Sequence, residues 1–145
     1  MKTILVVDDE LVCLQQVEEI LGRMGYNVIA KANGRSALTV ISDGTPVDLV
    51  ITDYCMPEMD GLEFVNALRR TDPALPLIMV TGYSDIESYV KARSLGVFEY
   101  LNKPVAAKEL GRVVRKVLEL SDLDRNNPMA LNPNRNTVDQ PKNDS

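Results

Sequence analysis

The stretch Thr3-Ile4-Leu5-Val6-Val7-Asp8-Asp9 opens the chain with a short apolar run that stops at two carboxylates. A run of this length, rich in β-branched residues, predicts a buried β-strand rather than a helix. Four further short runs of the same kind follow, at residues 27–31, 49–52, 77–80 and 97–101. The chain is therefore expected to contain five strands.

Segments with helical spacing of apolar residues separate these runs. In the first segment the predicted core stripe is Cys13, Val17, Ile20 and Met24. In the last segment it is Leu110, Val113, Val114, Val117 and Leu118. Ser84 and Glu87 have the spacing of a capping box, which predicts the start of the fourth helix. The pattern indicates five strand–helix repeats over residues 3–120.

Strict alternation of strands and helices predicts an α/β fold in which helices cover both faces of a parallel sheet. The first, third and fourth runs are continuously apolar, as strands buried on both faces should be. The second run has Asn27 and Lys31 at its ends, and the fifth carries Glu99, so these two are expected at the edges. We therefore predict a flavodoxin-like, doubly wound (βα)5 domain with strand order 2-1-3-4-5.

The composition limits what the domain can do. The 145 residues include 16 Lys+Arg and 21 Asp+Glu, for a formal charge of −5, which argues against direct nucleic-acid binding. The chain has no histidine, which excludes histidine-based catalysis and histidine metal ligands. Its two cysteines lack metal or CxxC spacing, and no apolar segment suits a signal peptide or membrane span, so a cytoplasmic location is expected.

Residues 121–145 are poor in apolar residues and are expected to form a flexible tail or truncated linker.

Polar side chains gather where the predicted strands end. The first strand ends in Asp8 and Asp9, the third in Asp53, the fourth in Thr81 and the fifth in Lys103. The carboxyl ends of parallel strands lie along one side of the sheet, and the ligand site of this fold lies there. We therefore expect three carboxylates, a hydroxyl and an ammonium group to meet in one site.

Three clustered carboxylates repel one another and favour a bound cation. Because the donors are all oxygens, the expected ion is Mg²⁺, for which Mn²⁺ can substitute, rather than zinc. Three carboxylates, one divalent ion and Lys103 sum to zero charge. An incoming phosphoryl group would make the sum negative. Thr81 and Lys103 would then hold its oxygens.

These residues carry a resemblance. Asp8-Asp9, Asp53 with Met56-Pro57 and Gly61, Thr81-Gly82, and Tyr100-Leu101-Asn102-Lys103-Pro104 resemble the signature motifs of the bacterial response-regulator receiver domain. The resemblance covers residues 3–120, and it is specific because these separated motifs occur in the family's order and spacing.

The resemblance implies a role for each of these residues. Asp53 would accept a phosphoryl group, and Asp8, Asp9, Asp53 and the backbone carbonyl of Cys55 would hold Mg²⁺. Thr81 and Lys103 would bind the phosphoryl group, and Thr81 and Tyr100 would form the switch. The Lys103–Pro104 peptide bond is expected to be cis.

The resemblance also implies partners. The phosphodonor would be a sensor histidine kinase or a phosphotransfer protein. It would dock on the first helix and on the loop around Pro104. Leu11 and Leu14 of this helix offer apolar surface outside the predicted stripe. A slightly wide core stripe explains these two leucines equally well. Cys55 and Tyr83 occupy positions that would tune the lifetime of the phosphoryl group, although ordinary loop residues are nearly as good an interpretation.

Downstream, the resemblance points to a surface formed by the fourth helix, fifth strand and fifth helix. Another protein, or an output domain outside this chain, would bind this surface. The resemblance also allows a homodimer. The cations on this surface are also typical of a solvated helix face. They are Lys91, Arg93, Lys108, Arg112, Arg115 and Lys116.

Three other functions remain as alternatives to a non-enzymatic switch that catalyses only its own phosphorylation and dephosphorylation. A Mg²⁺-dependent phosphohydrolase could use the same carboxylates, but Cys55 stands where a second acid or base would be useful. A phosphorylation-independent scaffold would not need the complete set of site residues. A nucleotide-binding domain lacks a glycine-rich loop after the first strand.

Overall fold

The computed structural model describes residues 1–82 and 86–126, which form five strand–helix repeats. The strands are β1 (Thr3–Val7), β2 (Asn27–Lys31), β3 (Leu49–Asp53), β4 (Leu77–Thr81) and β5 (Glu99–Asn102). The helices are α1 (Leu11–Arg23), α2 (Gly34–Ser42), α3 (Gly61–Thr71), α4 (Ile86–Ser94) and α5 (Ala107–Asn126). The predicted α/β architecture is confirmed.

All strand pairs are parallel, and the sheet order is β2-β1-β3-β4-β5, as predicted. Every residue of β3 and β4 is buried, because helices cover both faces of these central strands. The edge strand β2 has no fully buried residue. On the other edge, Glu99 of β5 forms an ion pair of 2.6 Å with Lys116 of α5.

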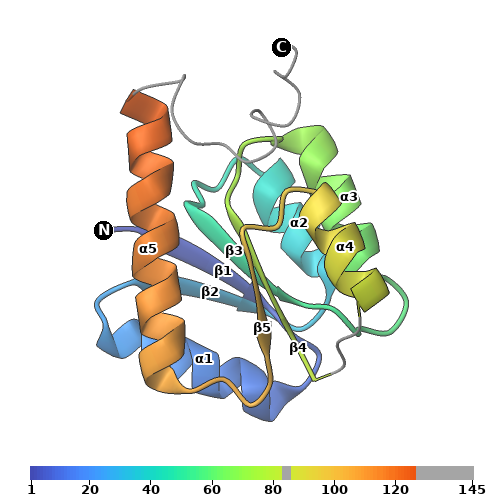
Figure 1. The fold of residues 1–145 in the computed structure, drawn as a ribbon, viewed down its shortest axis with the longest axis horizontal. Coiled ribbons are helices and arrows are strands. Elements are labelled where there is room, and N and C mark those ends of the chain that lie inside the picture. Colours follow the sequence, from blue (N-terminus) through green and yellow to red (C-terminus); the bar gives the residue numbers. More distant parts are fainter. Residues whose placement is uncertain (83–85, 127–145) are drawn as a thin grey trace.

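The two faces of the sheet have separate cores. Helices α1 and α5 cover one face, where Leu110, Val113, Val114, Val117 and Leu118 are buried as predicted. Helices α2, α3 and α4 cover the other face, whose core includes the fully buried Phe64 of α3. Figure 1 shows this arrangement, with α1 and α5 on one side of the sheet and the other three helices opposite.

The predicted core stripe of α1 is shifted by one position. The buried residues are Leu14, Val17 and Leu21, whereas Cys13, Ile20 and Met24 are only partly buried. Both sets fit helical spacing, and the contact with the sheet and α5 selects the second one. Of the two interpretations given for Leu14, the core stripe is therefore confirmed and the docking surface is wrong, whereas Leu11 is 61% exposed and lies next to the exposed Val12.

This shift predicts unequal effects of two alanine substitutions. Leu14→Ala should lower the free energy of unfolding by about 2–3 kcal/mol, because it leaves a cavity in the core between α1 and the sheet. Leu11→Ala should change it by less than about 0.5 kcal/mol. Urea denaturation followed by circular dichroism measures both values, and equal losses would contradict the assignment of the buried face.

Helix α5 continues to Asn126, six residues past the domain boundary predicted at residue 120. An ion pair of 2.8 Å between Asp122 and Lys2 ties this extension to the start of the chain. The rest of the predicted tail, residues 127–145, and the Ser84 half of the predicted capping box lie outside the described residues. Among the helices that the structure describes, none is long and apolar enough to cross a membrane.

Candidate functional site

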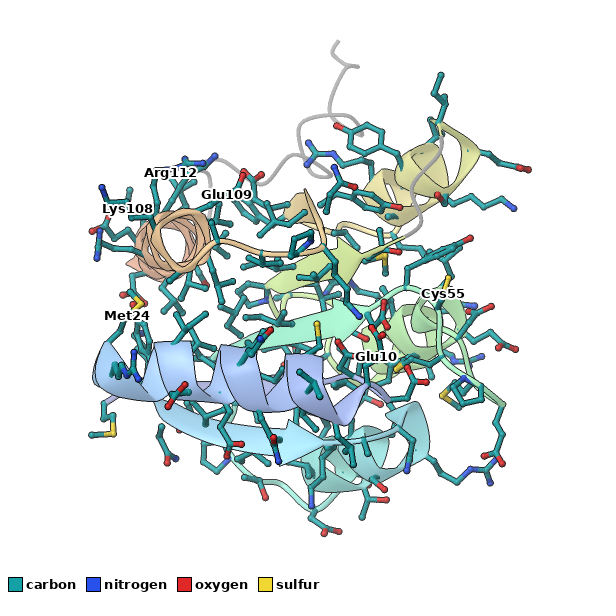
Figure 2. All side chains as sticks on the ribbon, turned by 90° about the horizontal axis from the view of Figure 1, so that it is seen from below. Glu10, Met24, Cys55, Lys108, Glu109 and Arg112 are labelled. Atoms are coloured by element: carbon teal, nitrogen blue, oxygen red, sulfur yellow. The ribbon has the colours of Figure 1, made fainter. Side chains whose placement is uncertain are left out.

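Parallel pairing brings the predicted residues together at the carboxyl-terminal ends of the strands. Asp53 and Thr81 are the last residues of β3 and β4, while Asp8 and Lys103 immediately follow β1 and β5. The register places Asp53 beside Val80, and Thr81 beside Asn102. In Figure 2, Glu10 and Cys55 lie at this end of the sheet, toward which the strand arrows point, and Met24 lies at the opposite end of α1.

The backbone orients two of the carboxylates. Asp8 Oδ1 accepts a hydrogen bond of 2.9 Å from the backbone N–H of Glu10. Asp53 Oδ1 accepts one of 3.3 Å from the backbone N–H of Cys55. Asp8 and Asp53 are only 5% and 4% exposed, so their second oxygens are held inside the site.

Lys103 supplies the positive charge of the site. Its Nζ lies 2.9 Å from Asp8 Oδ2 and 3.1 Å from Asp53 Oδ2, and it also forms an ion pair with Glu10. Burial opposes the charged ammonium, but hydrogen bonds to Glu10, Asp8 and Asp53 raise the pKa of Lys103 well above its usual value. Lys103 is therefore a permanent cation in this site.

Asp53 is held in an unfavourable environment for a carboxylate. Burial raises its pKa to about 6, and the nearby charge of Asp8 adds to the effect. The hydrogen bonds from Lys103 and from the N–H of Cys55 act in the opposite direction and are too weak to restore the usual value. A cation bound beside Asp53 would favour its ionised form.

Three carboxylates form a group that could hold a metal ion. Asp8, Asp9 and Asp53 each offer an oxygen, and these oxygens lie within 4.8 Å of one another. Asp9 Oδ1 is buried and has no hydrogen-bond partner among the described residues. A buried carboxylate oxygen without a partner is costly, so this oxygen suits a role as a ligand of a cation.

Other predicted residues flank this group. The Thr81 side chain is fully buried at the end of β4, and it acts on the Cys55 thiol by lowering its pKa. The Lys103–Pro104 peptide bond is cis, as predicted. Tyr83 lies outside the described residues, so its tuning role stays a prediction.

Cys55 is an exposed free thiol with a raised pKa. Burial raises its pKa, and the negative charges of Asp53 and Asp60 add to this effect. The pKa of Cys13 is also raised, mainly by burial. Because a protonated thiol is a poor nucleophile, neither cysteine has the features of a reactive nucleophile.

Tyr100 points away from the carboxylates. Its hydroxyl lies 3.1 Å from Ser88 Oγ of α4, and its ring packs edge-on against Tyr89 with centroids 5.6 Å apart. The predicted switch residues Thr81 and Tyr100 thus lie on neighbouring strands, the first at the site and the second against α4.

Three of the six cations of the predicted output surface make local contacts. Arg93 donates a hydrogen bond of 2.8 Å to the carbonyl of Phe98, and Lys91 pairs with Glu87 one turn away on α4. Lys116 is bound to Glu99. These contacts agree with the interpretation as a solvated helix face.

Sequence reasoning missed Glu10 as a member of the site. It follows Asp8 and Asp9 directly, and this adjacency was the available signal. Its contact is with Lys103, 93 residues away, and only the folded arrangement reveals it. Glu10 adds a fourth carboxylate to the predicted three. With one divalent ion and Lys103, the net charge of the site is then −1 instead of the predicted zero.

The family model described as "Response regulator receiver domain" matches residues 4–115. Among curated proteins, the chain is 34% identical over 122 residues to Regulatory protein AtoC of Escherichia coli K12, covering 84% of this chain and 26% of AtoC. It is 36% identical over 121 residues to the probable transcriptional regulator ycf27 of Cyanophora paradoxa, covering 83% of this chain and 50% of that protein. The chain thus spans a quarter to a half of these relatives.

Solved structures agree with the sequence relatives. A CheY-like response regulator receiver domain protein from Methanospirillum hungatei JF-1 superimposes with a TM-score of 0.82 at 30% identity, covering 86% of this chain and 98% of that one. The residues matched by the family model include every motif that surrounds the site, from Asp8 to Pro104. The chain belongs to the response regulator receiver domain family.

Proposed function

We propose that this domain is a phosphorylation-operated switch of a two-component system and that Asp53 accepts the phosphoryl group. The observation that carries the proposal is the position of Asp53, which ends the central strand β3 with Lys103 3.1 Å from its Oδ2. The carboxylates of Asp8 and Asp9 lie beside it within reach of a common cation. This combination offers a nucleophile, a fixed positive charge and a cation site at one place.

The residues fit Mg²⁺, or Mn²⁺ in its place. They offer only hard oxygen ligands, and Asp9 Oδ1 is buried without a partner in the described part of the chain. Asp8, Asp9 and Asp53 would hold the ion, together with the backbone carbonyl of Cys55. When bound, the ion would neutralise carboxylate charge and polarise the phosphoryl oxygens.

The chain's own residues perform the transfer. A carboxylate oxygen of Asp53 attacks the phosphorus of the donor and forms a new P–O bond. With a phosphohistidine donor, the P–N bond breaks, and the imidazole nitrogen keeps the electron pair and takes up a proton. Lys103 then pairs with the phosphoryl oxygens, and the hydroxyl of Thr81 donates a hydrogen bond to them.

The switch would act through Thr81 and Tyr100. If Thr81 moves toward the phosphoryl group, it vacates space beside β5 into which Tyr100 can turn. That rotation would break the contacts of Tyr100 with Ser88 and Tyr89, both on α4. Phosphorylation would thereby bias two arrangements of the surface formed by α4, β5 and α5.

The partners follow from the same surfaces. A histidine kinase or phosphotransfer protein would dock on the exposed Leu11 and Val12, beside the Pro104 loop. A downstream protein, an output domain or a second copy of the domain would read the α4–β5–α5 surface. The longer relatives named as regulators are consistent with an output domain.

A direct experiment is to incubate the protein with acetyl phosphate and Mg²⁺ and to measure its intact mass. We expect one added phosphoryl group per chain, lost on treatment with hydroxylamine, because an acyl phosphate is labile to that nucleophile. EDTA should prevent the addition. Peptide mapping should place the group on the peptide that contains Asp53.

The other outcomes separate the alternatives. Catalytic release of phosphate without a stoichiometric adduct would support a phosphohydrolase. Neither adduct nor phosphate release would support a phosphorylation-independent scaffold. Either result would contradict the proposed switch.

A further inference from the structure

Glu10 occupies the N-cap position of α1 but does not cap the helix. Within the described residues, its side chain makes no hydrogen bond to the backbone N–H groups of the first turn. Its carboxylate instead accepts a hydrogen bond from Lys103 Nζ. Glutamate is a poor N-cap compared with aspartate, so this residue serves the site rather than the helix.

All three donors of the Lys103 ammonium are in use. Its partners are Asp8, Asp53 and Glu10. An ammonium group offers no fourth hydrogen bond. A phosphoryl oxygen that pairs with Lys103 must therefore displace one of the three carboxylates.

The three carboxylates differ in how easily they can leave. The side chains of Asp8 and Asp53 are 7% and 5% exposed, and both are fixed by backbone N–H groups. The side chain of Glu10 is 63% exposed, so it can rotate into water at little cost. Glu10 is the partner that a phosphoryl oxygen would replace.

We propose that Glu10 competes with the phosphoryl group for Lys103 and thereby weakens the site's hold on that group. The inference rests on the proposed function and adds a residue that adjusts its affinity. The exchange is non-covalent: one carboxylate leaves Lys103, and one phosphoryl oxygen takes its place. Because both are anions, the exchange leaves the ammonium paired throughout.

Binding of beryllofluoride, a phosphoryl analogue, measures this competition at saturating Mg²⁺. We expect Glu10→Gln to bind it about two- to fivefold more tightly than wild type, the range corresponding to an exposed ion pair. The amide is neutral and releases Lys103 more readily. Calorimetric titration gives the dissociation constants, and a separate Mg²⁺ titration without beryllofluoride should show less than a twofold change.

Glu10→Asp separates competition for Lys103 from simple repulsion. The shorter side chain keeps the charge but withdraws it from Lys103 and favours capping of α1. Competition predicts that Glu10→Asp resembles Glu10→Gln in beryllofluoride affinity. Repulsion alone predicts that it resembles wild type, and that outcome would overturn the inference.

The matched control is Glu18→Gln, which removes the same charge from an exposed position about two turns along α1. It should bind beryllofluoride like wild type, and equal tightening in this control would overturn the inference. Unchanged or weaker binding by Glu10→Gln would also overturn it and leave the proposed function standing. A wild-type protein that neither binds beryllofluoride nor takes up a phosphoryl group would overturn both.

Discussion

An Asp53→Asn protein is expected to take up no phosphoryl group from acetyl phosphate, yet to resist urea better than wild type in EDTA. An amide cannot form the acyl phosphate, so the intact-mass adduct should be absent. The stability gain follows from burial, which raises the pKa of Asp53 to about 6 because its charged form is unfavourable in the folded state. At pH 7 and without metal, we expect the gain to be about 1–2 kcal/mol.

The gain should depend on pH with a defined sign. The pKa of Asp53 is higher in the folded protein than its ordinary value of 3.8, so between about pH 4 and 6 the folded state binds more protons. The contribution of Asp53 to stability is therefore lost as pH rises through this window. Asp53→Asn should exceed wild type by its full margin above pH 6 and by little below pH 4.

Asp43→Asn provides the control, because this exposed aspartate at the end of α2 undergoes the same chemical change far from the strand ends. It should keep the phosphoryl adduct and change the free energy of unfolding by less than about 0.5 kcal/mol. A phosphoryl adduct on Asp53→Asn would identify another acceptor. A loss of stability at pH 7 would contradict the unfavourable environment of Asp53.

The same residue illustrates how much of the site was predictable. Asp53 and the other strand-end residues could be assigned to one site because a parallel sheet brings the carboxyl ends of its strands together. The polar residues Asn27, Lys31 and Glu99 identified the two edge strands. Such arguments need only the period and the order of the strands. They predicted the topology and the acidic group correctly.

Sequence reasoning could not determine which face of α1 is buried or which distant residue the Glu10 side chain contacts. The stripes of α1 that begin at Cys13 and at Leu14 have almost the same spacing, and packing against the sheet decides between them. Glu10 lies outside every strand and meets Lys103 only because its side chain turns back over the site. Both errors concern side-chain direction, which hydrophobic periodicity does not determine.

Gly61→Ala should damage both stability and phosphorylation. A Cβ at this position would lie 2.2 Å from the carbonyl oxygen of Asp53 and 2.8 Å from Cα of Tyr54, and both contacts are with backbone that cannot rotate away. The N–H of Gly61 also donates a hydrogen bond of 2.8 Å to the carbonyl of Tyr54. Relief of the clash must separate the start of α3 from the end of β3, which should cost about 3–5 kcal/mol by urea denaturation.

The functional loss follows from the same displacement. Asp53 is the last residue of β3, so a shift of its carbonyl also moves the carboxylate away from Lys103 and from Asp8 and Asp9. We expect phosphorylation by acetyl phosphate to slow at least tenfold at a temperature where the variant remains folded, since misplacement of a reacting group by about 1 Å can cost a hundredfold. Gly22→Ala is the matched control, because no other described part of the chain, apart from its neighbours on α1, lies within 4 Å of the added Cβ, and alanine favours the helix. That control should gain up to about 1 kcal/mol and phosphorylate normally. Equal stability of Gly61→Ala and wild type would show that the loop after β3 yields without cost, which its contacts with the backbone of Asp53 and Tyr54 argue against.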